Sequence, residues 1–67
     1  MTVQLSIDIF EDGARTPVLT HTFYGRTAAD IKAVVAAHQQ TDSFFKAALT
    51  TKKFQGMTLT TRSRWTP

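Results

Sequence analysis

The chain has 67 residues, a net charge of +3 and no cysteine, and 42% of its residues are hydrophobic. Its length permits one small domain over residues 1–67, and the lack of cysteine excludes disulfide bonds and zinc sites with cysteine ligands. No apolar stretch approaches the ~18–20 residues of a membrane span, and the N-terminal Met-Thr-Val-Gln-Leu lacks the features of a signal peptide, so we expect a cytoplasmic protein.

Residues 2–10 alternate between apolar and polar side chains, and this period of two predicts a half-buried strand. Residues 15–24 form the second strand-like run, and residues 11–13 before it read Glu-Asp-Gly, a turn with a glycine suited to positive φ. The two runs therefore predict an N-terminal β-hairpin. The apolar members of the first run share one parity: Val3, Leu5, Ile7 and Ile9.

Parity also selects the length of the hairpin loop, because directly paired residues share one face of a sheet. A two-residue loop, Asp12-Gly13, would split the apolar side chains across both faces, whereas a three-residue loop over residues 11–13 gathers them on one face. We therefore predict the three-residue loop, with Gly13 in the left-handed conformation. The resulting register pairs Leu5 with Leu19, Val3 with His21 and Ile7 with Pro17.

Pro17 has no backbone N–H, so the strand that contains it is expected at an edge of the sheet. Residues 2–10 then form the central strand. The last strand is predicted at residues 57–65, with Met57, Leu59 and Trp65 on one face and threonines and arginines on the other. It must pair with the first strand, which gives a three-stranded sheet of order 2-1-3.

Helix is predicted to begin near Thr27, which with Asp30 forms a variant of the capping box. The apolar residues of Ile31–Leu49 keep helical spacing, which fits one long helix over residues 27–52. A polar segment near residues 40–42 favours a kink or a break into two helices. One continuous helix would return the last strand antiparallel to the first, and two antiparallel helices would return it parallel.

The predicted fold is therefore α+β with the element order ββα(α)β. One long kinked helix or two helices pack on one face of the three-stranded sheet, and the opposite face stays open.

His21, His38 and Asp42 are the one group that resembles a metal or general-base site. His38 and Asp42 are four residues apart and can meet on one face of a helix. A metal site would need further ligands, and the sequence has no HExxH pattern. We favour a partly buried sheet histidine and a helix histidine that Asp42 pairs with or caps, and we predict no metal.

Motifs for catalysis and cofactor binding are missing from the sequence. No serine stands in a G-x-S-x-G motif, and the three glycines form no phosphate-binding loop. A fold of this size also has little room for the concave pocket that small molecules usually occupy. We expect a protein that is not an enzyme and takes no cofactor or small-molecule substrate.

The open sheet face is the main candidate for binding, because it is rich in threonine and carries aromatic residues and arginines. It is either an ordinary solvated strand surface, an interface with a protein, or a surface for single-stranded nucleic acid. Asp8 on the same face disfavours phosphate binding. The candidate residues on this face are Phe10, Tyr24, Arg62 and Arg64.

Phe44 is a second candidate, because it follows the helical stripe less well than its neighbour Phe45. Adjacent helix residues point about 100° apart, so both side chains are buried only where a helix sits in a corner. We favour Phe44 covering the end of the sheet. The alternative is an exposed anchor with a basic rim formed by Lys46, Lys52 and Lys53.

These observations predict a small accessory or regulatory protein that acts as a protein-interaction module. Its partner would be another protein or a second copy, a homodimer formed through the open face or an edge strand. The alternative is a weak basic nucleic-acid-binding domain, and no membrane partner is expected. The size and layout are typical of small phage or mobile-element proteins.

Overall fold

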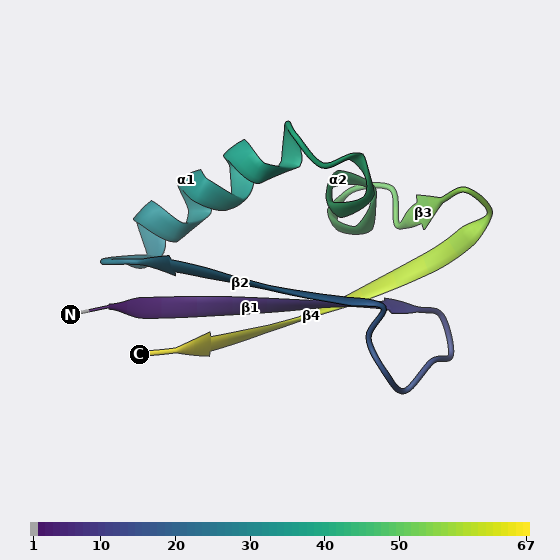
Figure 1. Ribbon diagram of the computed structural model, residues 1–67, viewed down its shortest axis with the longest axis horizontal. Helices are drawn as coiled ribbons and strands as arrows, with labels where there is room; N and C mark the ends of the chain where they lie inside the picture. The colour runs from purple at the N-terminus through teal and green to yellow at the C-terminus, as the bar shows by residue number, and fades with distance from the viewer. Residues whose placement is uncertain (1) are drawn as a thin grey trace.

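The computed structural model describes residues 2–67, and Met1 lies outside the described residues. The strands are β1 (Val3–Glu11), β2 (Leu19–Gly25), β3 (Lys53–Phe54) and β4 (Met57–Thr66), and the helices are α1 (Ala28–Gln39) and α2 (Ser43–Leu49). The strands form one antiparallel sheet of order β2-β1-β4-β3. Figure 1 shows both helices on the same side of this sheet.

The predicted α+β class is confirmed, and the predicted three-stranded sheet is incomplete. β1 lies between β2 and the last strand, β4, as predicted, although Pro17, on which that prediction depended, precedes β2 instead of lying in it. The fourth strand, β3, has two residues and pairs with the beginning of β4. A segment this short carries no readable periodicity, so the sequence pattern gave no sign of it.

The first hairpin keeps the predicted faces but has a longer loop. Leu5 pairs with Phe23, not with Leu19, and residues 12–18 form the loop. The partner of Leu5 has moved by four positions, an even number, so every side chain stays on its predicted face. Pro17 lies in the loop outside the ladder, and Gly13 has the predicted positive φ of 84°. The predicted three-residue loop is therefore wrong, although its turn at residues 11–14 forms, with Ala14 N donating to Glu11 O at 2.9 Å.

The helical region breaks at Gln40–Asp42, where the polar segment predicted a kink or a break. The Thr27 side chain caps α1 by accepting from the Asp30 N–H at 3.2 Å, and Asp42 caps α2 by accepting from the Phe45 N–H at 3.0 Å. Aspartate and threonine at these positions satisfy backbone N–H groups that a helix start leaves unpaired.

The last strand returns antiparallel to β1 even though there are two helices. α1 runs over the part of the sheet near the two chain termini, and α2 crosses further along, towards β3 (Figure 1). A tight turn then reverses the chain between Phe54 and Met57, where Gln55 and Gly56 have φ values of 47° and 83°. Paired positive φ values are typical of a two-residue hairpin loop. The arrangement expected to return a parallel strand, two antiparallel helices, does not occur, because α2 crosses instead of running back along α1 and this hairpin then reverses the chain (Figure 1).

The core lies between the sheet and the two helices. Each large apolar side chain that is fully buried stabilises the fold by about 1.5–3 kcal/mol relative to exposure. Phe44 is partly buried against this core and meets Phe54 edge-to-face, with ring centroids 5.2 Å apart. This position favours the interpretation in which Phe44 covers the end of the sheet. The buried core residues are Leu5, Ile7, Ile9, Phe23, Ile31, Phe45, Ala48 and Leu59.

Neither helix of residues 2–67 is both long enough and apolar enough to cross a membrane.

Candidate interaction surface

Asp8 is the centre of the open sheet face. It lies on β1 with Thr20 opposite on β2 and Arg62 opposite on β4, and Arg64 is two residues further along β4. Its side chain is only 2% exposed, although this face carries no helix. Buried carboxylates need hydrogen-bonding partners, and the neighbouring strands supply them here.

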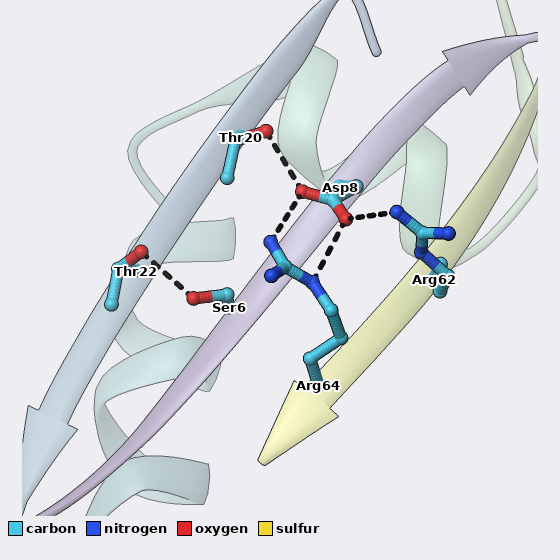
Figure 2. A network of polar contacts seen from close by, with 6 residues as sticks. All are labelled: Ser6, Asp8, Thr20, Thr22, Arg62 and Arg64. Atoms are coloured by element: carbon cyan, nitrogen blue, oxygen red, sulfur yellow. Dashed lines mark hydrogen bonds and ion pairs between the residues drawn. The ribbon is translucent and has the colours of Figure 1, made fainter. Parts of the chain in front are cut away.

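The contacts of Asp8 come from both neighbouring strands (Figure 2). Thr20 Oγ1 donates to Asp8 Oδ1 at 2.8 Å, and Arg62 Nη2 donates to Oδ2 at 3.2 Å. Arg64 donates from Nε to Oδ2 at 3.2 Å and from Nη2 to Oδ1 at 3.1 Å, a two-point contact that fixes the guanidinium plane. The hydrogen bonds from Thr20 and Arg64 lower the pKa of Asp8 by more than its burial raises it, so the carboxylate is charged at neutral pH.

The two arginines themselves remain largely exposed above Asp8. The Arg62 guanidinium carbon lies 5.5 Å from the centre of the Phe10 ring, in the position of a cation–π contact. Because two guanidinium groups face one carboxylate, the cluster of Asp8, Arg62 and Arg64 carries a net positive charge. We call it the Asp8–arginine cluster. It presents the remaining guanidinium N–H groups to solvent.

Tyr24 is 63% exposed but does not join Phe10 in one aromatic platform. It pairs with Gln4, and Phe10 is six residues further along β1. At ~3.3 Å per residue, the two aromatic residues are separated by roughly 20 Å. The structure thus places the predicted aromatic residues at opposite ends of the face, with Arg62 and Arg64 between them.

Lys52 and Lys53 lie at the β3 end of the sheet, away from Tyr24. Lys53 pairs with Thr58 on β4 and so shares the open face, and the Lys52 carbonyl accepts a hydrogen bond from the Leu59 N–H at 2.8 Å. Both lysines are exposed, and Phe44 packs on the opposite, helix side of the sheet. The structure therefore separates Phe44 from the basic residues of the open face.

The predicted strand order places the last strand at an edge of the sheet, and the structure shows which part of β4 is unpaired and which of its backbone groups point outwards. Thr58 O accepts from Asp12 N on the β1 side, and the next residue, Leu59, donates to Lys52 on the β3 side. Since backbone groups alternate in direction along an antiparallel strand, Thr61, Ser63 and Trp65 direct their N–H and C=O groups away from β1. Among residues 2–67, no strand pairs with this side of β4 beyond Leu59.

The side chains along this edge differ on the two faces of the sheet. Arg62 and Arg64 lie on the open face, and Trp65 lies on the helix side, where it pairs with Leu5. α1 packs mainly against β2 and also contacts β1, so Trp65 remains 50% exposed beside it. We call the segment Thr60–Thr66 with its outward backbone groups the β4 edge.

His21, His38 and Asp42, the group that resembled a metal or general-base site, lie close together on the helix side of the sheet. His21 and His38 have ring centroids 4.4 Å apart, and His38 Nε2 lies 3.4 Å from Asp42 Oδ2 without forming a hydrogen bond. Burial, and secondarily the nearby His38, lowers the pKa of His21. Residues 2–67 contain no cluster of three or more potential metal ligands, and they enclose no detectable pocket.

The sequence pattern placed Arg62 and Arg64 on the open face but did not predict their contact with Asp8. The alternation in residues 57–65 correctly separates the arginines from Trp65. The pairing of the two arginines with Asp8 depends on a register between residues more than fifty positions apart.

The chain matches no known family model, no curated protein and no solved structure at a significant level.

Proposed function

We propose that this chain is a non-enzymatic protein-interaction module that binds an extended protein segment along the β4 edge. The observation that carries the proposal is the row of outward backbone groups at Thr61, Ser63 and Trp65, which no strand of residues 2–67 satisfies. An exposed strand edge is a template for a further strand, and many domains bind peptides by this addition.

The side chains beside the edge leave room for such a strand. Charged side chains often protect an exposed edge by projecting over it. Here the hydrogen bonds to Asp8 draw the Arg64 guanidinium over β1 and the Arg62 guanidinium into the space between β4 and β1, so both side chains lean towards the middle of the sheet (Figure 2). The ladder between β1 and β4 pairs consecutive residues without interruption from Gln4–Thr66 to Glu11–Leu59, so the register along the β4 edge is unbroken.

A proline at Ser63 tests this proposal, because it removes an outward N–H without touching the ladder to β1. Peptides would be selected against the wild-type protein from a library of random ten-residue sequences and then synthesised. We expect them to bind Ser63→Val as they bind the wild type, and to lose at least about tenfold in affinity for Ser63→Pro, as removal of one or two main-chain hydrogen bonds would give.

Two controls keep this experiment decisive. Circular dichroism establishes that Ser63→Pro is folded. If it is not, amide exchange on the wild-type protein replaces it, with protection expected at Thr61, Ser63 and Trp65 when a selected peptide is bound. Recovery of no binding peptide, or equal binding by folded Ser63→Pro, would contradict the proposal.

Nucleic acid is the second candidate, and the contact between Arg62 and Phe10 is what favours it. An exposed arginine beside an aromatic ring is a common element of surfaces that bind single strands. Asp8 lies beneath the same arginine and reduces the local positive charge. This function predicts binding of a labelled oligothymidylate that weakens steeply with salt. No binding at low salt would exclude it.

A further inference from the structure

We infer that the segment bound at the β4 edge is acidic on one side and apolar on the other, with glutamates at alternate positions. This inference rests on the proposed function and adds the chemistry of its partner. Side chains of a strand alternate between the two faces of a sheet. A strand added beside β4 would therefore meet two different surfaces, one on each face.

On the open face, the added strand would lie beside the Asp8–arginine cluster. Asp8 occupies one part of each guanidinium group and leaves the other N–H groups exposed. The cluster has a net positive charge, and Lys53 adds a further positive charge on the same face. Adjacent strands are ~4.8 Å apart, and the Arg62 guanidinium lies between β4 and Asp8 (Figure 2), so a glutamate side chain on the added strand can extend towards Arg62 where a shorter side chain falls short. Arg64, which Asp8 holds further from the edge, adds positive charge to the same face without direct contact.

On the helix side, the added strand would lie beside Trp65. Half of this large side chain is exposed, although its cross-strand partner Leu5 is in the core. Apolar residues at the alternate positions of the partner would cover the exposed part of the ring. Tryptophan is enriched among the residues that contribute most to protein interfaces.

The same charges disfavour a second copy of this chain as the occupant. An antiparallel pairing that uses all the outward residues of both copies places Ser63 opposite Ser63 and Thr61 opposite Trp65. It also places Arg62 of one copy directly opposite Arg64 of the other. Like charges directly opposite each other on neighbouring strands are destabilising. An acidic strand would replace this repulsion between arginines by attraction between carboxylates and arginines.

Three matched peptides test the inference. The first is acetyl-Thr-Val-Glu-Val-Glu-Val-Glu-Val-Thr-amide, and the other two carry glutamine or lysine in place of each glutamate. We expect the glutamate peptide to bind roughly tenfold more tightly than the glutamine peptide, the sum of two or three modest ion pairs, and the lysine peptide to bind most weakly. The preference should shrink as salt rises from about 0.05 to 0.5 M, because exposed charges are screened.

Two variants separate the two faces of the edge. Replacing the cluster by amides, with Asp8→Asn, Arg62→Gln and Arg64→Gln together, should remove most of the preference for the glutamate peptide over the glutamine peptide, leaving only the contribution of Lys53. Trp65→Ser should weaken all three peptides and keep their order of affinity. If the triple variant does not fold, the salt dependence of the wild-type preference decides instead.

Each outcome has one interpretation. Equal binding of the glutamate and glutamine peptides, with loss of both in Ser63→Pro, would overturn the acidic partner and leave the β4 edge as a binding site. No peptide binding, with a dimer seen by sedimentation that Ser63→Pro abolishes, would assign the edge to a second copy and overturn the inference. Failure of these three peptides to bind a monomer that still binds library-selected peptides at the β4 edge would overturn the acidic partner alone. Failure of both the three peptides and the library selection would contradict the proposed function as well.

Discussion

Arg64 donates from Nε and Nη2 to both carboxylate oxygens of Asp8, at 3.2 and 3.1 Å. The two residues are 56 positions apart in the chain and lie on neighbouring strands, β4 and β1. The contact therefore joins the first strand to the last on the face that no helix covers. It explains how an aspartate stays buried on an open sheet face, and it gives Arg64 a fixed orientation.

Asp8→Asn should destabilise the protein more than Arg62→Gln or Arg64→Gln. The asparagine has one acceptor oxygen in place of two, so it loses the two-point contact with Arg64, and it leaves two adjacent positive charges uncompensated. Each arginine variant, in contrast, leaves Asp8 with the other arginine and Thr20. Urea unfolding of the three variants gives the comparison. A midpoint for Asp8→Asn equal to that of the wild type would show that the cluster contributes no stability.

Stability should fall as the pH drops through the ordinary titration range of histidine, near 6.5. Burial lowers the pKa of His21, so the unfolded chain takes up its proton first and the folded state loses free energy relative to it at lower pH. The titratable groups that face His21 are His38 on α1 and Asp42 at the start of α2.

The variant His21→Gln provides the control for this prediction. Its thermal midpoint should change less than that of the wild-type protein between pH 7.5 and pH 5.5, because the group with the lowered pKa is gone. Parallel pH profiles for the two proteins would contradict the assignment of the effect to His21.

The face of the sheet on which each strand residue lies was predictable from this sequence, whereas the register between the two strands of the first hairpin was not. The period of two in residues 2–10 fixes which side chains face the core, and a shift of the partner strand by an even number of residues leaves that result unchanged. The length of the loop depends on where Pro17 and the turn at Gly13 can be accommodated, which alternation does not report. The break at Gln40–Asp42 was predictable because helix caps are local.

The candidate site was predictable in composition but not in arrangement. Arg62 and Arg64 were assigned to the open face from parity alone. Their pairing with Asp8 requires the antiparallel register of β1 and β4, which joins residues more than fifty positions apart and has no local pattern in either strand. Likewise, the exposed half of Trp65 follows from the place where α1 lies on the sheet, a consequence of tertiary packing rather than of any local pattern.

Phe45 and Phe44 are adjacent but should respond differently to truncation. Phe45 is fully buried and contacts His38 with ring centroids 4.7 Å apart, whereas Phe44 is only partly buried. Phe45→Ala should cost about 3–5 kcal/mol in the free energy of unfolding, and Phe44→Ala about half of that or less. Chemical denaturation measures both. A larger loss of stability for Phe44→Ala than for Phe45→Ala would contradict the structure, in which Phe45 makes the main packing contact of α2 with the core.

Amide hydrogen exchange along β4 should alternate from residue to residue in the isolated protein. The N–H groups of Arg62 and Arg64 point towards β1 and should be protected, whereas those of Ser63 and Trp65 point outwards and should exchange rapidly. Because the two sets are interleaved, fraying at the end of the strand affects both and cannot produce the alternation. Measuring the exchange at several protein concentrations provides the control. Protection of the Ser63 and Trp65 amides that grows with protein concentration would show that a second copy occupies the β4 edge. If these amides were as protected as those of Arg62 and Arg64 at every concentration, their N–H groups would already be hydrogen-bonded within one chain.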